Sequence, residues 1–343
     1  MSKRPIRTTG KTTHAGAAPV AVALNAVILV VDEDAPKVLC ARSADGAIGL
    51  PYGPFDPARH RTFETGLREW VERQTSVRLG FVEQLYTFGD KGREAPAALI
   101  EGGDASARVV SVGYLALAAE AAPVNAADAQ WRSWYDFFPW EDWRRGAPQV
   151  LEAVIEPGFT AWFRRATDAA TRAQREARVA AAFGMGDLPW EEERALDRYE
   201  AMYEAGLVAE SWRDRTAAGL APPGGDPDLP RATGLSMGSD HRRILATAIG
   251  RVRGKLKYRP IVFDLMPSRF TLLSLQRAVE AIVGFNLHKQ NFRRHVEGAG
   301  LVEKTELTER QTSGRPAALF KAAAMPDKAA GGLSIPRVRT AVR

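Results

Sequence analysis

The chain has 343 residues, of which 45% are hydrophobic and 26% are charged. A sequence of this length and composition folds into about two globular domains and is neither disordered nor fibrous. Cys40 is the single cysteine, which excludes an intrachain disulfide and favours a cytoplasmic protein.

Charge is distributed unevenly along the chain. Residues 241–343 contain 20 Lys and Arg against 7 Asp and Glu, whereas residues 1–240 contain 27 against 34. A basic C-terminal part on an acidic body predicts that this part binds a polyanion such as nucleic acid.

The first 19 residues, 1–19, are expected to form a disordered basic tail. The apolar run that follows, 17–31, is similar to the core of a signal peptide, but Asn25 interrupts it and acidic residues 32–34 end it. It is also too short to span a bilayer. We therefore predict a buried strand and expect no membrane association.

Apolar runs and one amphipathic stretch predict an α+β domain over residues 20–143. The amphipathic stretch has Phe63, Leu67, Trp70 and Val71 on one face, which is typical of a helix packed on a sheet. The predicted elements are strands at 20–32, 37–42, 77–85 and 109–117 and a helix at 62–75.

The predicted helix 62–75 resembles part of a Nudix box, which runs Gly, five residues, Glu, seven residues, then Arg-Glu-apolar-x-Glu-Glu-x-Gly. Glutamates three or four residues apart on one helix face jointly hold Mg²⁺ against a pyrophosphate. Residues 68–72 match this pattern. However, Arg73 replaces the last glutamate, and the upstream glutamate falls on His60, or on Arg59 after a one-residue slip.

These departures predict a pocket that has lost its metal and its hydrolytic activity but still attracts a phosphate through Arg73. The alternative at this point is that Glu69 and Glu72 are ordinary surface residues of a helix.

Residues 144–235 are expected to form a helical insertion, because Ala, Glu and Arg recur there with helical periodicity. The apolar stripe of Leu196, Tyr199 and Met202 is typical of core packing rather than of a cofactor site. The insertion ends in a linker rich in Pro and Gly at 221–230.

Residues 236–325 are predicted to form a winged helix-turn-helix, preceded within that range by a helix at 241–257. An apolar helix at 271–283 is followed by a basic helix at 288–297 and then by a hairpin. The alternative is a solvated basic helix on a small α/β module. The last residues, 326–343, form a basic tail.

Several further segments resemble Nudix-related transcriptional regulators of NAD metabolism, in particular a divergent alphaproteobacterial type. The resemblance covers most of 20–143 and 240–321. It implies a Nudix-like α/β/α domain joined to a C-terminal winged helix in a dimeric repressor. The helical insertion departs from the common pattern. The segments that carry the resemblance are 84–90, 108–117, 240–245, 253–258, Phe263-Asp-Leu, Phe270-Thr-Leu, 291–294 and 314–317.

Charge, hydrogen-bonding capacity and position indicate which residues contact DNA or a ligand. Donor-rich side chains suit base edges and phosphates, and aromatic rings can stack a base, although such rings more often belong to the core. The candidate DNA contacts are Lys257, Arg269, Lys289, Gln290, Asn291, Arg293, Arg294, His295, Arg310 and Arg315. The candidate ligand contacts are Arg42, Glu69, Glu72, Arg73, Tyr86, Phe88, Arg93 and Arg108.

The sequence thus leads to one main hypothesis and one alternative. The main hypothesis is a ligand-responsive repressor of NAD biosynthesis or salvage genes that binds operator double-stranded DNA as a homodimer. Its effector would be ADP-ribose, NAD or a related nucleotide, and it would need no catalytic residue, metal or cofactor. The alternative is an active Nudix pyrophosphatase acting on ADP-ribose or a similar nucleotide diphosphate.

Overall fold

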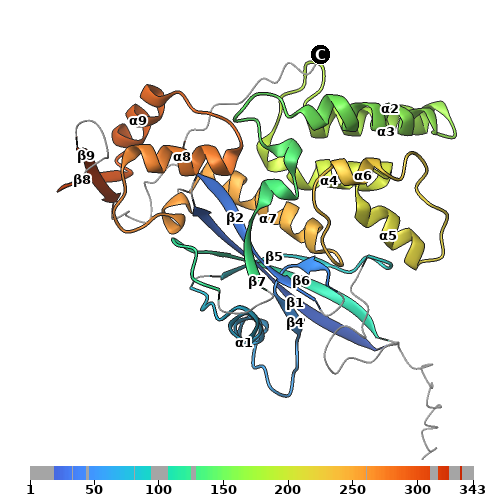
Figure 1. Ribbon diagram of the computed structural model, residues 1–343, viewed down its shortest axis with the longest axis horizontal. Coiled ribbons are helices and arrows are strands. Elements are labelled where there is room, and N and C mark those ends of the chain that lie inside the picture. The colour runs from blue at the N-terminus through green and yellow to red at the C-terminus, as the bar shows by residue number, and fades with distance from the viewer. Residues whose placement is uncertain are drawn as a thin grey trace, which may run out of the picture.

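The computed structural model describes residues 19–32, 34–43, 46–80, 82–93, 107–124, 129–259, 261–309, 316–323 and 333 (Figure 1). Within them a mixed β-sheet has one helix on one face and a layer of helices on the other. The strands are β1 (Val20–Asp32), β2 (Ala35–Arg42), β3 (Ile48–Gly49), β4 (Tyr52–Pro54), β5 (Val82–Phe88), β6 (Arg108–Leu117) and β7 (Ala129–Ser133). The single helix is α1 (Phe63–Thr75), and the helix that crosses the opposite face is α7 (His241–Leu256).

Strand β1 lies at the centre of the sheet, parallel to β6 and antiparallel to β2 and β4. Its side chains alternate between two cores: Leu24 and Ile28 pack on the side of α1, and Val27 and Leu29 pack on the side of α7. Because both faces are covered, the strand is an almost continuous apolar run. This strand and β6, both predicted from the sequence, are confirmed.

Helix α1 begins and ends where its local sequence indicates. The Thr65 backbone N–H donates to the Thr62 hydroxyl at 3.2 Å, and the Thr62 N–H donates back to the Thr65 hydroxyl at 3.1 Å. This reciprocal pair satisfies two free donors of the first turn. At the other end Ser76 adopts a left-handed φ of 60° and terminates the helix.

The predicted strand at 77–85 is wrong at its start, because β5 begins only at Val82. The guanidinium of Arg68 donates to the backbone carbonyls of Leu79 and of Gly80, the latter at 2.7 Å. These bonds hold the segment after α1 against the helix, so its backbone is not available for pairing in the sheet.

Helix α7 forms the third layer of an α/β/α arrangement. Ile244, Leu245 and Val252 share a core with the sheet residues that face away from α1. Gly113 of β6 permits this approach, since a Cβ there would lie 2.9 Å from Ile244 Cγ2. The sequence predicted this helix within the C-terminal range 236–325, whereas in the structure it covers the sheet.

A helical region formed by residues 134–232 lies on the far side of α7 from the sheet (Figure 1). Its helices pack on one another mainly through apolar and aromatic side chains. Tyr199 and Met202 are buried in this core, as the stripe predicted. The helical elements from 134 to 232 are the short turns η2 (Trp134–Asp136), η3 (Pro139–Glu141), η4 (Leu151–Ile155) and η5 (Glu192–Arg194), and the helices α2 (Glu156–Arg164), α3 (Ala169–Phe183), α4 (Ala195–Ala205), α5 (Ala209–Ala217) and α6 (Leu229–Ala232).

A buried cluster of three charges joins these layers to the C-terminal part. Arg198 Nε donates to Glu141 Oε1 at 2.5 Å, and Arg253 donates to the other oxygen of the same carboxylate. All three side chains are almost completely buried. Burial opposes ionisation of Glu141, but the two guanidiniums hold the pKa of its carboxyl below the usual range. Arg253 also donates to the carbonyl of Ile282 at 2.8 Å, which extends the cluster to the next domain.

The C-terminal domain is a winged helix, as predicted. Thr271 caps its first helix, and Gly284 ends that helix with a φ of 86°. Phe270 forms a bridge with Phe320 beside the hairpin. The predicted hairpin is present, and most side chains of its first strand are polar. The elements are η6 (Ile261–Leu265), α8 (Leu272–Val283), α9 (Lys289–Gly298), β8 (Val302–Glu309) and β9 (Ala317–Ala322).

Two further facts concern the ends of the chain and the membrane. Leu333 is the one described residue of the predicted tail 326–343. It is buried, and its N–H donates to the Leu256 carbonyl at 2.8 Å. Nowhere in the described ranges is a helix both long and apolar enough to cross a membrane. The predicted tail 1–19 lies outside the described residues except for Pro19.

Cys40 lies in β2, fully buried in the large core on the face of the sheet away from α1. Burial raises the pKa of its thiol to about 12, even though the nearby Arg132 opposes this shift. The thiol is therefore protonated and screened from solvent in the folded protein.

Candidate functional site

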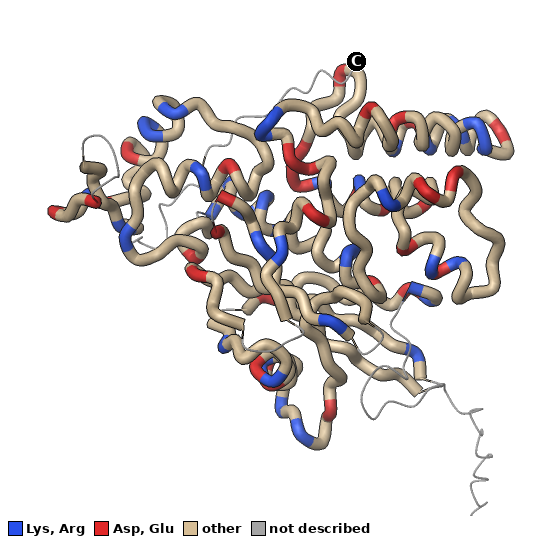
Figure 2. Tube along the Cα trace, in the orientation of Figure 1, with Lys and Arg blue, Asp and Glu red and all other residues tan. Residues whose placement is uncertain are grey.

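Helix α9 presents a donor-rich surface at one end of the molecule (Figure 2). Only Phe292 and Val296 anchor it in the core. The exposed face includes Asn291 and Arg294, whose side chains are joined by a bond from the guanidinium to the amide oxygen at 3.1 Å. Amide and guanidinium groups in this arrangement suit hydrogen bonds to base edges and phosphates.

Five of the other predicted DNA contacts lie near this exposed face. Lys289 and Gln290 are exposed on α9, Arg293 and His295 are half-buried there, and Arg269 is exposed just before α8. These five residues lie on or beside the helix pair.

Lys257 was expected to contact DNA phosphates, but the structure assigns it another role. Its ammonium lies 2.9 Å from Glu192 Oε1 and 2.6 Å from Glu193 Oε2. These carboxylates raise its pKa although burial opposes the charged form. An ammonium neutralised by two carboxylates within the protein is a poor phosphate contact. Arg310 and Arg315, predicted at the tip of the wing, lie outside the described residues.

The degraded box helix α1 carries its glutamates in ion pairs with cations of the same chain. Arg59 Nη2 donates to Glu69 Oε1 at 2.7 Å, and Arg78 Nε donates to Glu72 Oε1 at 2.8 Å. His60 Nε2 lies 3.3 Å from Glu69 Oε2, while its Nδ1 accepts the Asp56 N–H at 3.0 Å. Arg59 and His60 are the two residues that align with the upstream glutamate of the box, and their spacing did not indicate that both would face Glu69.

These residues do not fit a hard divalent cation. The box of an active pyrophosphatase directs several carboxylates at one point. Here each remaining carboxylate faces an arginine, and a histidine stands where the upstream carboxylate belongs. Across the described ranges, no three His, Cys, Asp or Glu side chains converge in a way that would hold a metal ion.

Arg73 lies on a rigid support between α1 and β4. Its guanidinium carbon is 3.8 Å from the centre of the Trp70 ring. The Trp70 indole N–H donates to the Pro54 carbonyl at 2.8 Å, which fixes the ring. Gly53 lies directly under this ring, since a Cβ there would come within 2.0 Å of it. The exposed side chain of Arg73 is thus held in place at the position where the Nudix pattern has its last glutamate.

The remaining predicted ligand contacts are not gathered around α1. Phe88 is buried and belongs to the core, so it is not free to stack a base, whereas Tyr86 is 62% exposed. Arg108 donates to the Gly89 carbonyl. Arg42 lies at the end of β2 and donates to the Gly46 carbonyl at 3.2 Å.

Arg93 faces the helical region rather than α1. Its guanidinium pairs with Glu200 at 2.9 Å and with Asp240 at 3.3 Å, and it stacks over Tyr203 at 3.8 Å. The carboxylates keep this side chain charged although burial opposes the charged form, so its pKa is raised. Arg93 therefore does not belong to the same site as Glu69.

Two features define the class of this protein. One is an α/β/α domain with a degenerate Nudix box, and the other is a C-terminal winged helix whose second helix is exposed and basic. Residues 262–322 match the family model of the NrtR DNA-binding winged helix domain. This region is therefore a winged helix domain of the NrtR family, and the predicted resemblance is confirmed.

Similar proteins support the same assignment. The ADPR responsive transcriptional repressor NtrR of Acinetobacter baylyi is 38% identical over 93 residues, which are 27% of this chain and 37% of that repressor. The alignment thus spans little more than a third of the relative's length.

Two solved structures have a similar fold over most of their length. Shewanella oneidensis NrtR in complex with a 27mer DNA is 19% identical, with a TM-score of 0.51 over 88% of this chain and 93% of that one. NrtR of the same organism is also 19% identical, with a TM-score of 0.50 over 92% and 99% of the two chains. The predicted combination of a Nudix-like domain and a winged helix is therefore confirmed as the fold.

Proposed function

We propose that this protein is a transcriptional repressor that binds operator DNA through α9 and responds to a nucleotide bound by its Nudix-like domain. The observation that carries the proposal is the exposed basic face of α9 within a winged helix of the NrtR family. A homodimer would place two copies of α9 in successive major grooves of a near-palindromic site. The regulated genes would be those of NAD biosynthesis or salvage, as the resemblance implies.

The effector we propose is ADP-ribose, with NAD and related nucleotides as the other members of the class. The Acinetobacter baylyi relative is described as ADPR responsive, which supports this choice. Arg73, held on Trp70, supplies a fixed cation for a phosphate of the ligand. The effector can change DNA affinity only if it binds one arrangement of the dimer better than another.

We further propose that the Nudix-like domain binds its nucleotide without hydrolysing it. Arg73 and His60 support this, because they stand where the pattern has glutamates and leave too few carboxylates to hold a divalent cation. The test is release of AMP from ADP-ribose with and without Mg²⁺. Turnover that depends on Mg²⁺ would favour the alternative, a pyrophosphatase tethered to nucleic acid by its winged helix.

DNA binding is tested by fluorescence anisotropy with duplexes from promoters of NAD genes. Arg294→Gln and Asn291→Ala should each weaken binding, because both side chains are exposed on α9. Arg172→Gln is the matched control, since Arg172 is an exposed arginine on α3, far along the chain from α9. Equal affinity of all three variants would refute the assignment of α9.

A further inference from the structure

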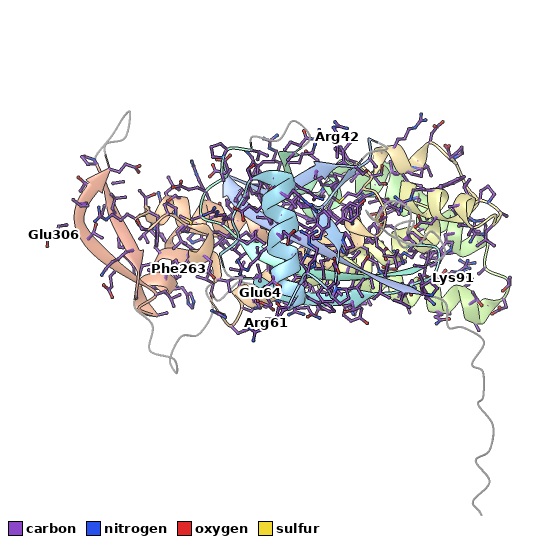
Figure 3. All side chains as sticks on the ribbon, turned by 90° about the horizontal axis from the view of Figure 1, so that it is seen from below. Arg42, Arg61, Glu64, Lys91, Phe263 and Glu306 are labelled. Atoms are coloured by element: carbon purple, nitrogen blue, oxygen red, sulfur yellow. The ribbon has the colours of Figure 1, made fainter. Side chains whose placement is uncertain are left out.

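A large basic pocket lies between the helical region and the loop after β5, away from the box helix. It has a volume of about 740 Å³, which falls in the range of small-molecule sites. Figure 3 shows Lys91, one of its lining residues, at the side of the helical region. No residue of α1 lines it.

The lining is dominated by cations. Six of the lining side chains carry a positive charge, and two, Glu204 and Asp214, are carboxylic acids. Glu204 pairs with Arg178 at 2.6 Å, and Asp214 lies 2.7 Å from Arg213. Arg93 pairs with Glu200 and Asp240, which do not line the pocket. The pocket still retains an excess of positive charge after these ion pairs are formed. The six cations are Lys91, Arg93, Arg165, Arg175, Arg178 and Arg215.

Three of these arginines are held by neutral groups. Arg175 donates to the Trp162 carbonyl at 2.8 Å and stacks on the Trp162 ring at 4.5 Å. Arg215 Nε donates to the Ala221 carbonyl at 2.6 Å, and Arg165 donates to the Ala205 carbonyl at 3.4 Å. Within the part of the chain that the structure describes, none of the three forms an ion pair.

This arrangement fits a ligand with several phosphoryl groups. A guanidinium fixed through one or two of its N–H groups still offers the others to an oxyanion, and arginine binds phosphate in a bidentate way. Leu220 and Pro223 add an apolar side to the pocket, and Leu220 is 56% exposed. An exposed leucine beside a cationic wall provides a surface for the part of the ligand that carries no phosphate.

We infer that the helical insertion contains a second ligand site, which binds a nucleoside di- or triphosphate through Arg165, Arg175 and Arg215. The site is separate from the one proposed at α1. It also does not depend on DNA binding, so failure of either proposal leaves the other testable.

The test is isothermal titration calorimetry of the full chain with ATP, ADP and inorganic tripolyphosphate, without Mg²⁺. The variant that removes the site is Arg165→Gln with Arg215→Gln. The control is Arg164→Gln with Arg172→Gln, which changes the net charge equally at exposed positions that do not line the pocket. Far-UV circular dichroism verifies that both variants are folded.

The wild type and the control should bind ATP saturably, at one site per chain in addition to any site at α1. The pocket variant should lose about tenfold in affinity for each arginine removed, as expected for a charge-assisted hydrogen bond. Arg73→Gln should leave this binding unchanged. The inference is overturned if no phosphate compound binds, if both double variants bind equally well, or if Arg73→Gln abolishes binding.

Discussion

Glu141→Gln is the substitution that best tests the buried charge cluster. The change keeps the shape of the side chain but leaves the guanidiniums of Arg198 and Arg253 buried without a carboxylate. Their remaining partners are backbone carbonyls, for example Ala182 at 2.9 Å and Ile282 at 2.8 Å. Carbonyl oxygens solvate a guanidinium but do not neutralise its charge.

Removing one partner of a buried ion pair costs about 3–5 kcal/mol. The unfolding entropy is about 2.1 cal/mol/K per residue, or roughly 0.7 kcal/mol/K for 343 residues unfolding together. The melting temperature of Glu141→Gln should therefore fall by roughly 4–7 °C. If only part of the chain unfolds in the transition, the entropy is smaller and the fall is larger.

Differential scanning calorimetry measures this change directly. The control is Glu191→Gln, because Glu191 is 42% exposed and lies 3.5 Å from Arg194. A surface pair of this kind contributes less than about 1 kcal/mol. If the two variants melt at the same temperature, the carboxylate of Glu141 does not neutralise the buried arginines and the reasoning is wrong.

Three other predictions concern pH, packing and salt. Burial raises the pKa of Asp240 to about 6 and lowers that of His241 to about 3, so acid stabilises the fold through Asp240 and destabilises it through His241. Asp240→Asn removes the first effect. Measured by urea unfolding, its free energy of unfolding should fall between pH 7 and pH 4 by about 2 kcal/mol more than that of the wild type. An identical fall would contradict the raised pKa of Asp240. Gly53→Ala places a methyl group 2.0 Å from the Trp70 ring and should lower the free energy of unfolding by roughly 1–3 kcal/mol, whereas Gly80→Ala, with no atom within 4 Å, should be nearly neutral. Arg294→Gln should reduce the slope of log K against log salt concentration by about 0.9 if this side chain contacts a phosphate, and an unchanged slope would assign it to another role.

Elements with a strong pattern could be predicted from the sequence. β1 is an apolar run covered on both faces, and α8 has a clear apolar stripe between Thr271 and Gly284. The start of β5 could not be predicted, because it depends on the bonds that Arg68 makes to the segment after α1. The sequence also predicted α7 as a helix, but it did not show that this helix packs on the sheet.

The candidate site was predictable in its chemistry but not in its partners. The loss of box carboxylates was visible in the spacing of Arg73 and His60. The pairing of Glu69 with Arg59 depends on how the preceding loop folds back, which spacing does not determine. The residues that line the basic pocket lie more than 100 positions apart in the sequence, for example Lys91 and Arg215. No local sequence motif therefore predicts this pocket.

The reactivity of the buried Cys40 thiol can report how often the core opens. A thiol-reactive dye can reach this sulfur only when the core around β2 opens, so the labelling rate measures how often that opening occurs. No cysteine has to be added or removed for this experiment, because Cys40 is the single cysteine of the chain. The same chemistry, repeated on the protein bound to duplex or to a nucleotide, would compare how tightly each partner closes the core.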